Sequence, residues 1–345
     1  MKTYYRILFS FLAVFSLFSA KAASLDKEKL ADFTPKQLNK ALEFKQSIQT
    51  EKGYSSSVYV YSKRSVKDYE REPNKLAARL SVLGFTDVYV SCEQAFANDE
   101  NARLSWQKTF ISEAHKWGIK VHSLRLSSAK LFVSDQRVMD ECKSVKDYNQ
   151  SVVANERFDG ISADLEPHIL KKNFADRPQG LTLTWDSKEN MGIGKDNDLL
   201  LKRTIDVLEM AQKEIKPLVL SEAIGFFVQS RVNDGLVEHG SASEYLKFCN
   251  SIIVMAYNND MKRIWEMSKP AISAADDKPK SVSIAIKTSL GTFGDEGVTT
   301  SLQPGGWANL ISSIKYIIEQ GAYEKAFKGV DVFEYQGFEI MLNAE

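Results

Sequence analysis

The sequence predicts an α/β fold, a (β/α)8 TIM barrel with an N-terminal helical extension. Eight short runs rich in β-branched and aromatic residues alternate with helical patterns, which is typical of a parallel sheet built from βαβ units. Eight such repeats favour a closed barrel over an open sheet, and the chain length fits one barrel of about 250 residues plus a leader. A Gly-rich phosphate-binding loop does not follow the first run, which argues against a nucleotide-binding fold.

The first residues have the pattern of a secretory signal peptide. Basic residues stand near the start, an apolar run covers 7–18, and Ala20 and Ala22 form a small-residue cleavage site. We therefore expect residues 1–22 to be removed and the protein to be periplasmic or secreted. Later apolar runs are shorter than the roughly 20 residues that a membrane span requires, so we expect no span.

The elements are then expected in the following order. Residues 23–54 form an N-terminal helical segment, with an amphipathic helix over 25–50 that packs on the outside or the bottom of the barrel, and the barrel itself covers 55–345. The eight predicted strands are 57–61, 87–91, 120–126, 160–167, 218–224, 251–258, 282–288 and 330–335. Helices are expected within 66–83, before 117–118, within 135–158, and at 197–215, 243–249, 261–274 and 307–320. The long segment 169–195 should border the mouth of the active site, because long loops in compact domains are usually functional.

Charge and cysteine content exclude several classes of function. Forty-five basic and forty-five acidic residues balance, which argues against a nucleic-acid-binding surface. The 43% of hydrophobic residues is enough for a large core. Cys92, Cys142 and Cys249 are widely separated and lack metal-ligand spacing, so we interpret them as buried thiols, with one disulfide left open.

The segment 158–168 carries the most informative chemistry. Period-two alternation on a strand directs Ser162, Asp164 and Glu166 to one face, toward the carboxyl end where barrel active sites lie. Two neighbouring carboxylates repel each other and resist burial, which favours retention of a proton, as a general acid requires.

A second motif lies on the sixth predicted strand, which reads Ile-Val-Met-Ala-Tyr-Asn and ends at Asn258. Together the two strands resemble those of chitinase-type (family 18) glycoside hydrolases, whose motifs are Asp-Gly-apolar-Asp-apolar-Asp-x-Glu and Met-x-Tyr-Asp. Asp159, Asp164 and Glu166 match the first motif, whereas Ser162 and Asn258 stand where the family has Asp.

The resemblance implies an enzyme that cleaves an N-acetylhexosamine-containing glycan without a cofactor. Glu166 would protonate the glycosidic oxygen, the 2-acetamido oxygen of the sugar would attack the anomeric carbon, and Asp164 would stabilise the resulting oxazolinium. Tyr257 would donate its hydroxyl to the acetamido group, and Met255 would line the floor of the pocket.

Two alternatives remain open from the sequence. One is a non-catalytic carbohydrate-binding barrel, and the other is a two-carboxylate retaining glycosidase that uses Glu166 with Glu222. Further candidate substrate contacts are Asp159, Asn258, His168, Glu222, Trp185, Trp307 and Tyr335, the last of which we expect to face the barrel centre. His122 and His168 lack metal-ligand spacing, so we expect no metal site.

Overall fold

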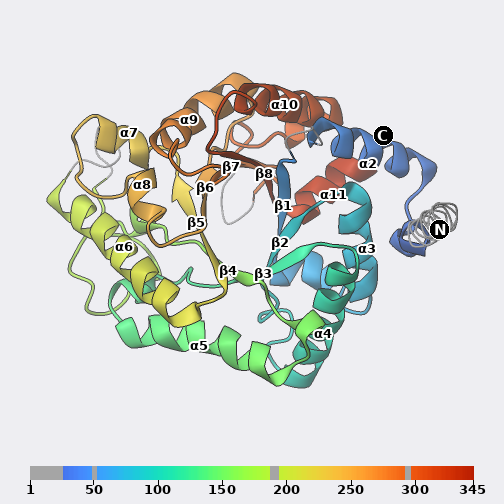
Figure 1. Cartoon of the computed structure of the whole chain (residues 1–345), viewed down its shortest axis with the longest axis horizontal. Coiled ribbons are helices and arrows are strands. Elements are labelled where there is room, and N and C mark those ends of the chain that lie inside the picture. The colour runs from blue at the N-terminus through green and yellow to red at the C-terminus, as the bar shows by residue number, and fades with distance from the viewer. Residues whose placement is uncertain (1–25, 49–52, 187–193, 292–296) are drawn as a thin grey trace, which may run out of the picture.

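Eight parallel strands close into a barrel in the order β1 to β8, with helices around them (Figure 1). The computed structural model describes residues 26–48, 53–186, 194–291 and 297–345. The strands are β1 (Ser55–Val60), β2 (Asp87–Val90), β3 (Lys120–Leu124), β4 (Gly160–Ala163), β5 (Val219–Gly225), β6 (Ser251–Met255), β7 (Val282–Lys287) and β8 (Phe327–Phe333). The closed parallel barrel confirms the predicted fold class.

The main helices follow the strands and form the outer ring. They are α2 (Pro35–Ile48), α3 (Pro73–Leu83), α4 (Glu100–Lys116), α5 (Asp135–Ser151), α6 (Lys195–Ile215), α7 (Val228–Asn233), α8 (Ala242–Tyr245), α9 (Met261–Ala274), α10 (Gly306–Gly321) and α11 (Tyr335–Asn343). Helix α9 has the predicted bounds. The helix predicted within 66–83 begins later, as α3, and a short helical turn, η1 (Ser62–Val66), precedes it. Helices α7 and α11 were not predicted.

The barrel has an apolar outer face and a mixed inner face. Outward positions such as Val58, Val254 and Ile284 join the large core between sheet and helices. The inward positions include serines and a group of aromatic residues. The inward serines are Ser57, Ser162, Ser221, Ser251 and Ser283. Small polar residues leave room in the lumen, whereas branched apolar residues fill the outer layer.

Closure of the barrel depends on a close approach between its last and first strands. Gly329 in β8 pairs with Ser55 in β1 and has a φ of 150°, which side-chain-bearing residues rarely adopt. A Cβ at this position would lie 2.0 Å from the carbonyl oxygen of Ser55. Glycine therefore permits the two backbones to pair here.

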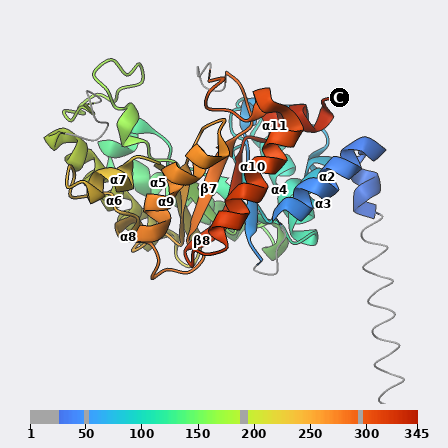
Figure 2. The same cartoon turned by 90° about the horizontal axis from the view of Figure 1, so that it is seen from above.

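The N-terminal helix α2 packs on the outside of the barrel, as predicted, beside α3, α10 and α11 (Figures 1 and 2). Phe44 is fully buried there, with its ring centroid 4.8 Å from that of Phe338. The amine of Lys40 donates to the last carbonyls of α11, including that of Ala344 at 2.7 Å. These contacts join the two ends of the described chain.

The three cysteines are free and buried, which confirms their interpretation as thiols. None of the helices in the described ranges has the length and apolar character needed to cross a membrane. The predicted signal peptide, 1–22, lies outside the described residues.

Candidate active site

A cavity of about 630 Å³ opens at the carboxyl ends of the strands. Its walls come from seven strand ends and from the loop that follows β4. The lining residues are Tyr59, Tyr61, Leu124, Ser127, Asp164, Glu166, Ile169, Phe174, Asp176, Ala223, Met255, Tyr257, Lys287 and Phe333. This is the end of the barrel where active sites of such folds lie.

Strand β4 directs the two predicted carboxylates into this cavity. Ile161, Ala163 and Leu165 belong to the outer core, so the alternate positions, Asp164 and Glu166, face inward as predicted. The side chain of Glu166 is 30% exposed. Asp164, deeper in the cavity, is half-buried.

The surroundings of Asp164 favour its protonated form. Burial raises the pKa of Asp164 well above its ordinary value, and the nearby charge of Glu166 raises it further. One of its oxygens, Oδ1, is buried without a hydrogen-bond partner among the described residues. A protonated carboxyl with an unpaired oxygen is suited to form a hydrogen bond with a ligand that enters the cavity.

Strand β6 places Met255 and Tyr257 in the same cavity, as the second motif predicts. Burial raises the pKa of Tyr257 well above 10, and the charges of Tyr61, Asp164 and Glu166 raise it further. Its hydroxyl therefore remains a neutral donor over the working pH range. Asn258, by contrast, does not line the cavity, and its Oδ1 accepts from the backbone N–H of Asp260 at the start of α9.

Aromatic rings that the sequence analysis missed form one wall of the cavity. The ring centroid of Phe333 lies 5.1 Å from that of Tyr257 and 5.8 Å from that of Tyr61, and Tyr59 stacks on Tyr61 at 6.1 Å. The alternation of Tyr59 and Tyr61 with Val58 in β1 is a signal that could have identified this wall. Flat apolar rings with hydroxyl edges suit the apolar face of a sugar.

The prediction that Tyr335 faces the barrel centre is wrong. It shares the inward parity of Phe333, but β8 ends at Phe333 and Tyr335 begins α11. Its hydroxyl accepts from Arg79 Nε at 3.3 Å, in the layer between barrel and helices. Glu334, which stands between Phe333 and Tyr335 in the sequence, is buried, and its carboxylate accepts from backbone amides in the first turn of α11.

The structure also contradicts Glu222 as a nucleophile. Leu220 and Ile224, which share its parity on β5, belong to the outer core, whereas Ala223 lines the cavity. Glu222 is buried outside the lumen, where its Oε1 accepts from the backbone N–H of Leu165 at 3.0 Å. Burial raises its pKa well above the ordinary value, and the charge of Asp164 raises it further, so it is a neutral carboxyl in the wrong layer for the two-carboxylate mechanism.

Asp159 lies at the opposite end of the barrel from Glu166, so its prediction as a substrate contact is wrong. It precedes the first residue of β4, and its Oδ2 accepts from His115 Nε2 at 2.8 Å and from the backbone N–H of Val121 at 2.7 Å. Its role is to hold the amino ends of β3 and β4 together.

Neither predicted tryptophan platform faces the cavity. Trp185 is buried, with its ring edge-on to those of His168 and Phe227. Trp307 packs against Phe44 at the outer helix α2, and its indole N–H donates to Glu43 at 2.9 Å. Both rings pack against other parts of the chain and hold their segments in place. A position in a loop does not determine which way a ring points, so the prediction failed for both.

His168 lies beside Glu166. Its Nε2 is 3.4 Å from Glu166 Oε1, and its ring packs edge-on against Phe227 at 5.5 Å. The imidazole can therefore orient the carboxyl of Glu166, although His168 does not itself line the cavity.

The loop after β4 contributes Ile169, Phe174 and Asp176 to the cavity wall, in agreement with the prediction that this segment borders the site. Arg177 fastens the loop by donating to backbone carbonyls, including that of Leu183 at 2.6 Å. Asp176 is a further carboxylate that the sequence analysis missed, because no strand periodicity governs loop residues. Residues 187–193 of the predicted loop lie outside the described residues.

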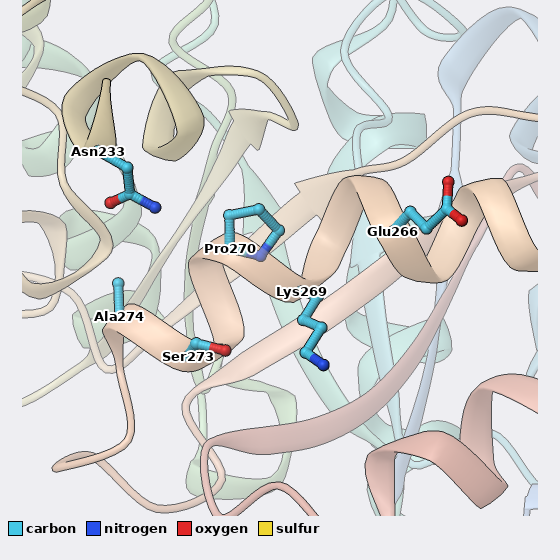
Figure 3. A pocket seen from close by; sticks show the side chains of 6 residues that line it. All are labelled: Asn233, Glu266, Lys269, Pro270, Ser273 and Ala274. Carbon is cyan, nitrogen blue, oxygen red and sulfur yellow. The ribbon is translucent and has the colours of Figure 1, made fainter. Parts of the chain in front are cut away.

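Another depression, of about 530 Å³, lies on the outside of the molecule (Figure 3). Its lining consists of Asn233 in α7 and five residues of α9, among them Lys269 and Pro270. Among the described residues that line it, none lies at the end of a barrel strand. We therefore assign the chemistry to the cavity at Glu166.

No protein-family model and no curated protein matches the sequence. Among solved structures, the chain is similar to a GH18 chitinase from Pseudoalteromonas aurantia, with a TM-score of 0.48, 12% identity and coverage of 82% of this chain and 94% of that one. It is also similar to an endo-β-N-acetylglucosaminidase from Cordyceps militaris (TM-score 0.45, 13% identity, 86% and 85% covered). A third similar structure is the spore cortex-lytic enzyme SleL from Bacillus megaterium (TM-score 0.46, 10% identity, 85% and 74% covered). The fold assignment rests on the closed, eight-stranded parallel barrel itself.

Proposed function

We propose that this protein is an exported glycoside hydrolase that cleaves an N-acetylhexosamine-containing glycan by substrate-assisted acid catalysis. The observation that carries the proposal is the convergence of Glu166, a proton-retaining Asp164 and the neutral hydroxyl of Tyr257 in one aromatic-walled cavity. Export rests on the predicted signal peptide.

The first step breaks the glycosidic bond. The Asp164 and Glu166 pair holds a proton, and Glu166 delivers it to the glycosidic oxygen, so that the leaving sugar departs with a hydroxyl group. At the same time the carbonyl oxygen of the 2-acetamido group attacks the anomeric carbon and forms an oxazolinium ion. Tyr257 donates to that carbonyl oxygen, and Asp164 accepts from the acetamido N–H, which stabilises the positive charge.

In the second step Glu166, now ionised, takes a proton from water as the water oxygen attacks the anomeric carbon. The bond to the acetamido oxygen breaks, the sugar is released as a hemiacetal, and Glu166 is protonated again. This scheme requires no protein nucleophile, which agrees with the position of Glu222 outside the lumen.

The test compares wild type with Glu166→Gln on a chromogenic N-acetylhexosaminide and on N-acetylated oligosaccharides, with calorimetric binding in parallel. Glu166→Gln keeps the shape of the side chain but cannot deliver a proton, so we expect a loss of about 10²–10⁴-fold in kcat with binding retained. Tyr257→Phe should lower kcat/KM by about 10-fold or more on acetylated substrates, because it removes one donor.

Glu222→Gln is the matched control, since it makes the same chemical change outside the lumen and should keep kcat within a few-fold of wild type. Asp176→Asn separates two mechanisms. A loss as large as that of Glu166→Gln would assign Asp176 as a general base and would exclude the substrate-assisted scheme. If wild type binds these glycans but never cleaves them, the protein is a carbohydrate-binding barrel instead.

A further inference from the structure

A second cavity, of about 520 Å³, continues the candidate active site along the rim of the barrel. The two cavities share Tyr61, Leu124 and Ser127 in their walls. The second is formed by the segments that follow β1, β2 and β3, together with the first turns of α5. A chain that fills the first cavity therefore has a direct route into the second.

The two cavities differ in charge. Asp164, Glu166 and Asp176 line the first, against one amine, Lys287. Lys63, Arg64, Arg125 and Arg137 line the second, against the carboxylates of Glu93 and Glu141. Among its described lining residues, the second cavity therefore has two more positive than negative charges. It attracts anions, which the first cavity repels.

Arg125 is held rigidly at the junction. The next residue, Leu126, has a φ of 56°, a left-handed conformation that is costly for a side-chain-bearing residue. Two hydrogen bonds fix this conformation, one from Arg125 N–H to the Ser162 carbonyl at 3.0 Å and one from Leu126 N–H to Glu141 Oε2 at 2.9 Å. The rim thus maintains a strained backbone that sets the position of Arg125 next to β4.

The guanidinium of Arg125 still has hydrogen-bonding capacity. Its Nη2 lies 2.6 Å from Glu93 Oε1, whereas its Nε is without a partner among the described residues. Lys63, which lines the same cavity, is exposed. Arg64 is a third cation, but its Nη1 donates to Gln336 Oε1 at 3.0 Å and lies 3.6 Å from the buried carboxylate of Glu334, so Arg125 and Lys63 are the groups that remain for a ligand.

We propose that the second cavity binds a carboxylate carried by the glycan, so that the substrate is an acidic N-acetylated glycan. The inference rests on the proposed function and specifies its substrate class. The acetamido sugar occupies the cavity at Glu166, and the acidic substituent of a neighbouring unit lies against Arg125 and Lys63, since a planar guanidinium and a carboxylate match in geometry.

The experiment uses the full chain with Glu166→Gln, so that ligands bind without being cleaved. The probes are two tetrasaccharides of N-acetylglucosamine, one alternating with glucuronic acid and one carrying 3-O-lactyl groups on alternate units, each as free acid and as neutral methyl ester. We expect at least one acid to bind about 10-fold or more tightly than its ester at low salt, and the difference to shrink at high salt. The inference is overturned if neither acid binds more tightly than its ester.

Charge-removing variants locate the effect. Lys63→Gln, at an exposed position, and Arg125→Gln should each lower the affinity for the acid by several-fold and leave the affinity for the ester unchanged. Lys269→Gln removes the same charge at the outer depression of Figure 3 and should leave both affinities unchanged. If Lys63→Gln and Lys269→Gln lowered the affinity for the acid equally, the effect would come from the net charge of the protein, and the proposed carboxylate site would be rejected.

Failure of this inference and failure of the proposed function give different results. Hydrolysis of neutral N-acetylated glycans without any preference for the acids would support the enzyme and reject the carboxylate site. Selective binding of an acid without turnover by wild type would support the carboxylate site and reject the hydrolase.

Discussion

Asp87→Asn should destabilise the barrel at neutral pH and have little effect in acid. Asp87 begins β2 and points into the lumen, where its Oδ1 is 3.0 Å from His122 Nε2 and its Oδ2 accepts from Thr86 Oγ1 at 2.7 Å. Burial alone would raise the pKa of Asp87. The hydrogen bond and charge of His122, with the charge of Lys328, outweigh burial and lower that pKa to about 2.

The size of the effect follows from this pKa. Because the folded pKa is below the unfolded one, ionised Asp87 stabilises the fold above about pH 4, and this contribution is lost as the pH falls toward 2. A pKa of about 2 in place of 3.8 corresponds to about 2 kcal/mol at neutral pH. Asn keeps the shape and an acceptor oxygen but has no charge, so the variant should lose about that much at pH 7.

Urea unfolding of wild type and Asp87→Asn, followed by tryptophan fluorescence at several pH values between 7 and 2.5, measures the difference in free energy of unfolding. The difference should narrow steadily below pH 4. Asp32→Asn is the control, because Asp32 forms a surface ion pair with Lys75 at 3.0 Å and should contribute less than about 1 kcal/mol. A difference that stays constant over the whole pH range would refute the ionic role of Asp87.

Two further predictions concern other buried side chains. Burial and the charge of Asp164 raise the pKa of Glu222, so its contribution to stability is present below the unfolded pKa and declines as the pH rises. Glu222→Gln cannot ionise and should gain stability relative to wild type as the pH rises above the unfolded pKa of Glu222 in the same urea series, and parallel curves would contradict the raised pKa. Phe44→Ala should cost about 3–5 kcal/mol because it leaves a cavity between α2 and α11. Leu42→Ala, at a 54% exposed position of the same helix, is its control, and equal losses would show that α2 is not anchored by Phe44.

The sequence was informative wherever a period of two could be combined with apolar outward positions. On β4 the outward Ile161 and Ala163 correctly assigned Asp164 and Glu166 to the cavity. The same reasoning applied to Leu220 on β5 would have placed Glu222 outside the lumen.

The alternation of side chains along a strand could not predict the direction of side chains at strand ends and in loops. The parity of β8 correctly grouped Phe333 with Tyr335, but parity has no meaning once the chain turns into a helix, so Tyr335 was misplaced. Trp185 could not be assigned to a side from its position in a loop. Arg125 and Lys63 are distant in sequence, and only closure of the barrel brings them to one cavity.

Asp87 and Asp164 both face the lumen and have opposite pKa shifts, which separates their roles. At the amino end His122 and Lys328 compensate the burial of Asp87, so that its charge is retained and supports the fold. At the carboxyl end burial and a like charge from Glu166 act together on Asp164, so that it retains a proton instead. An uncompensated buried carboxyl costs stability, and such a cost is typical of groups that act on a substrate. The barrel therefore favours a charged carboxylate at Asp87, beside His122, and a protonated carboxyl at Asp164, in the cavity.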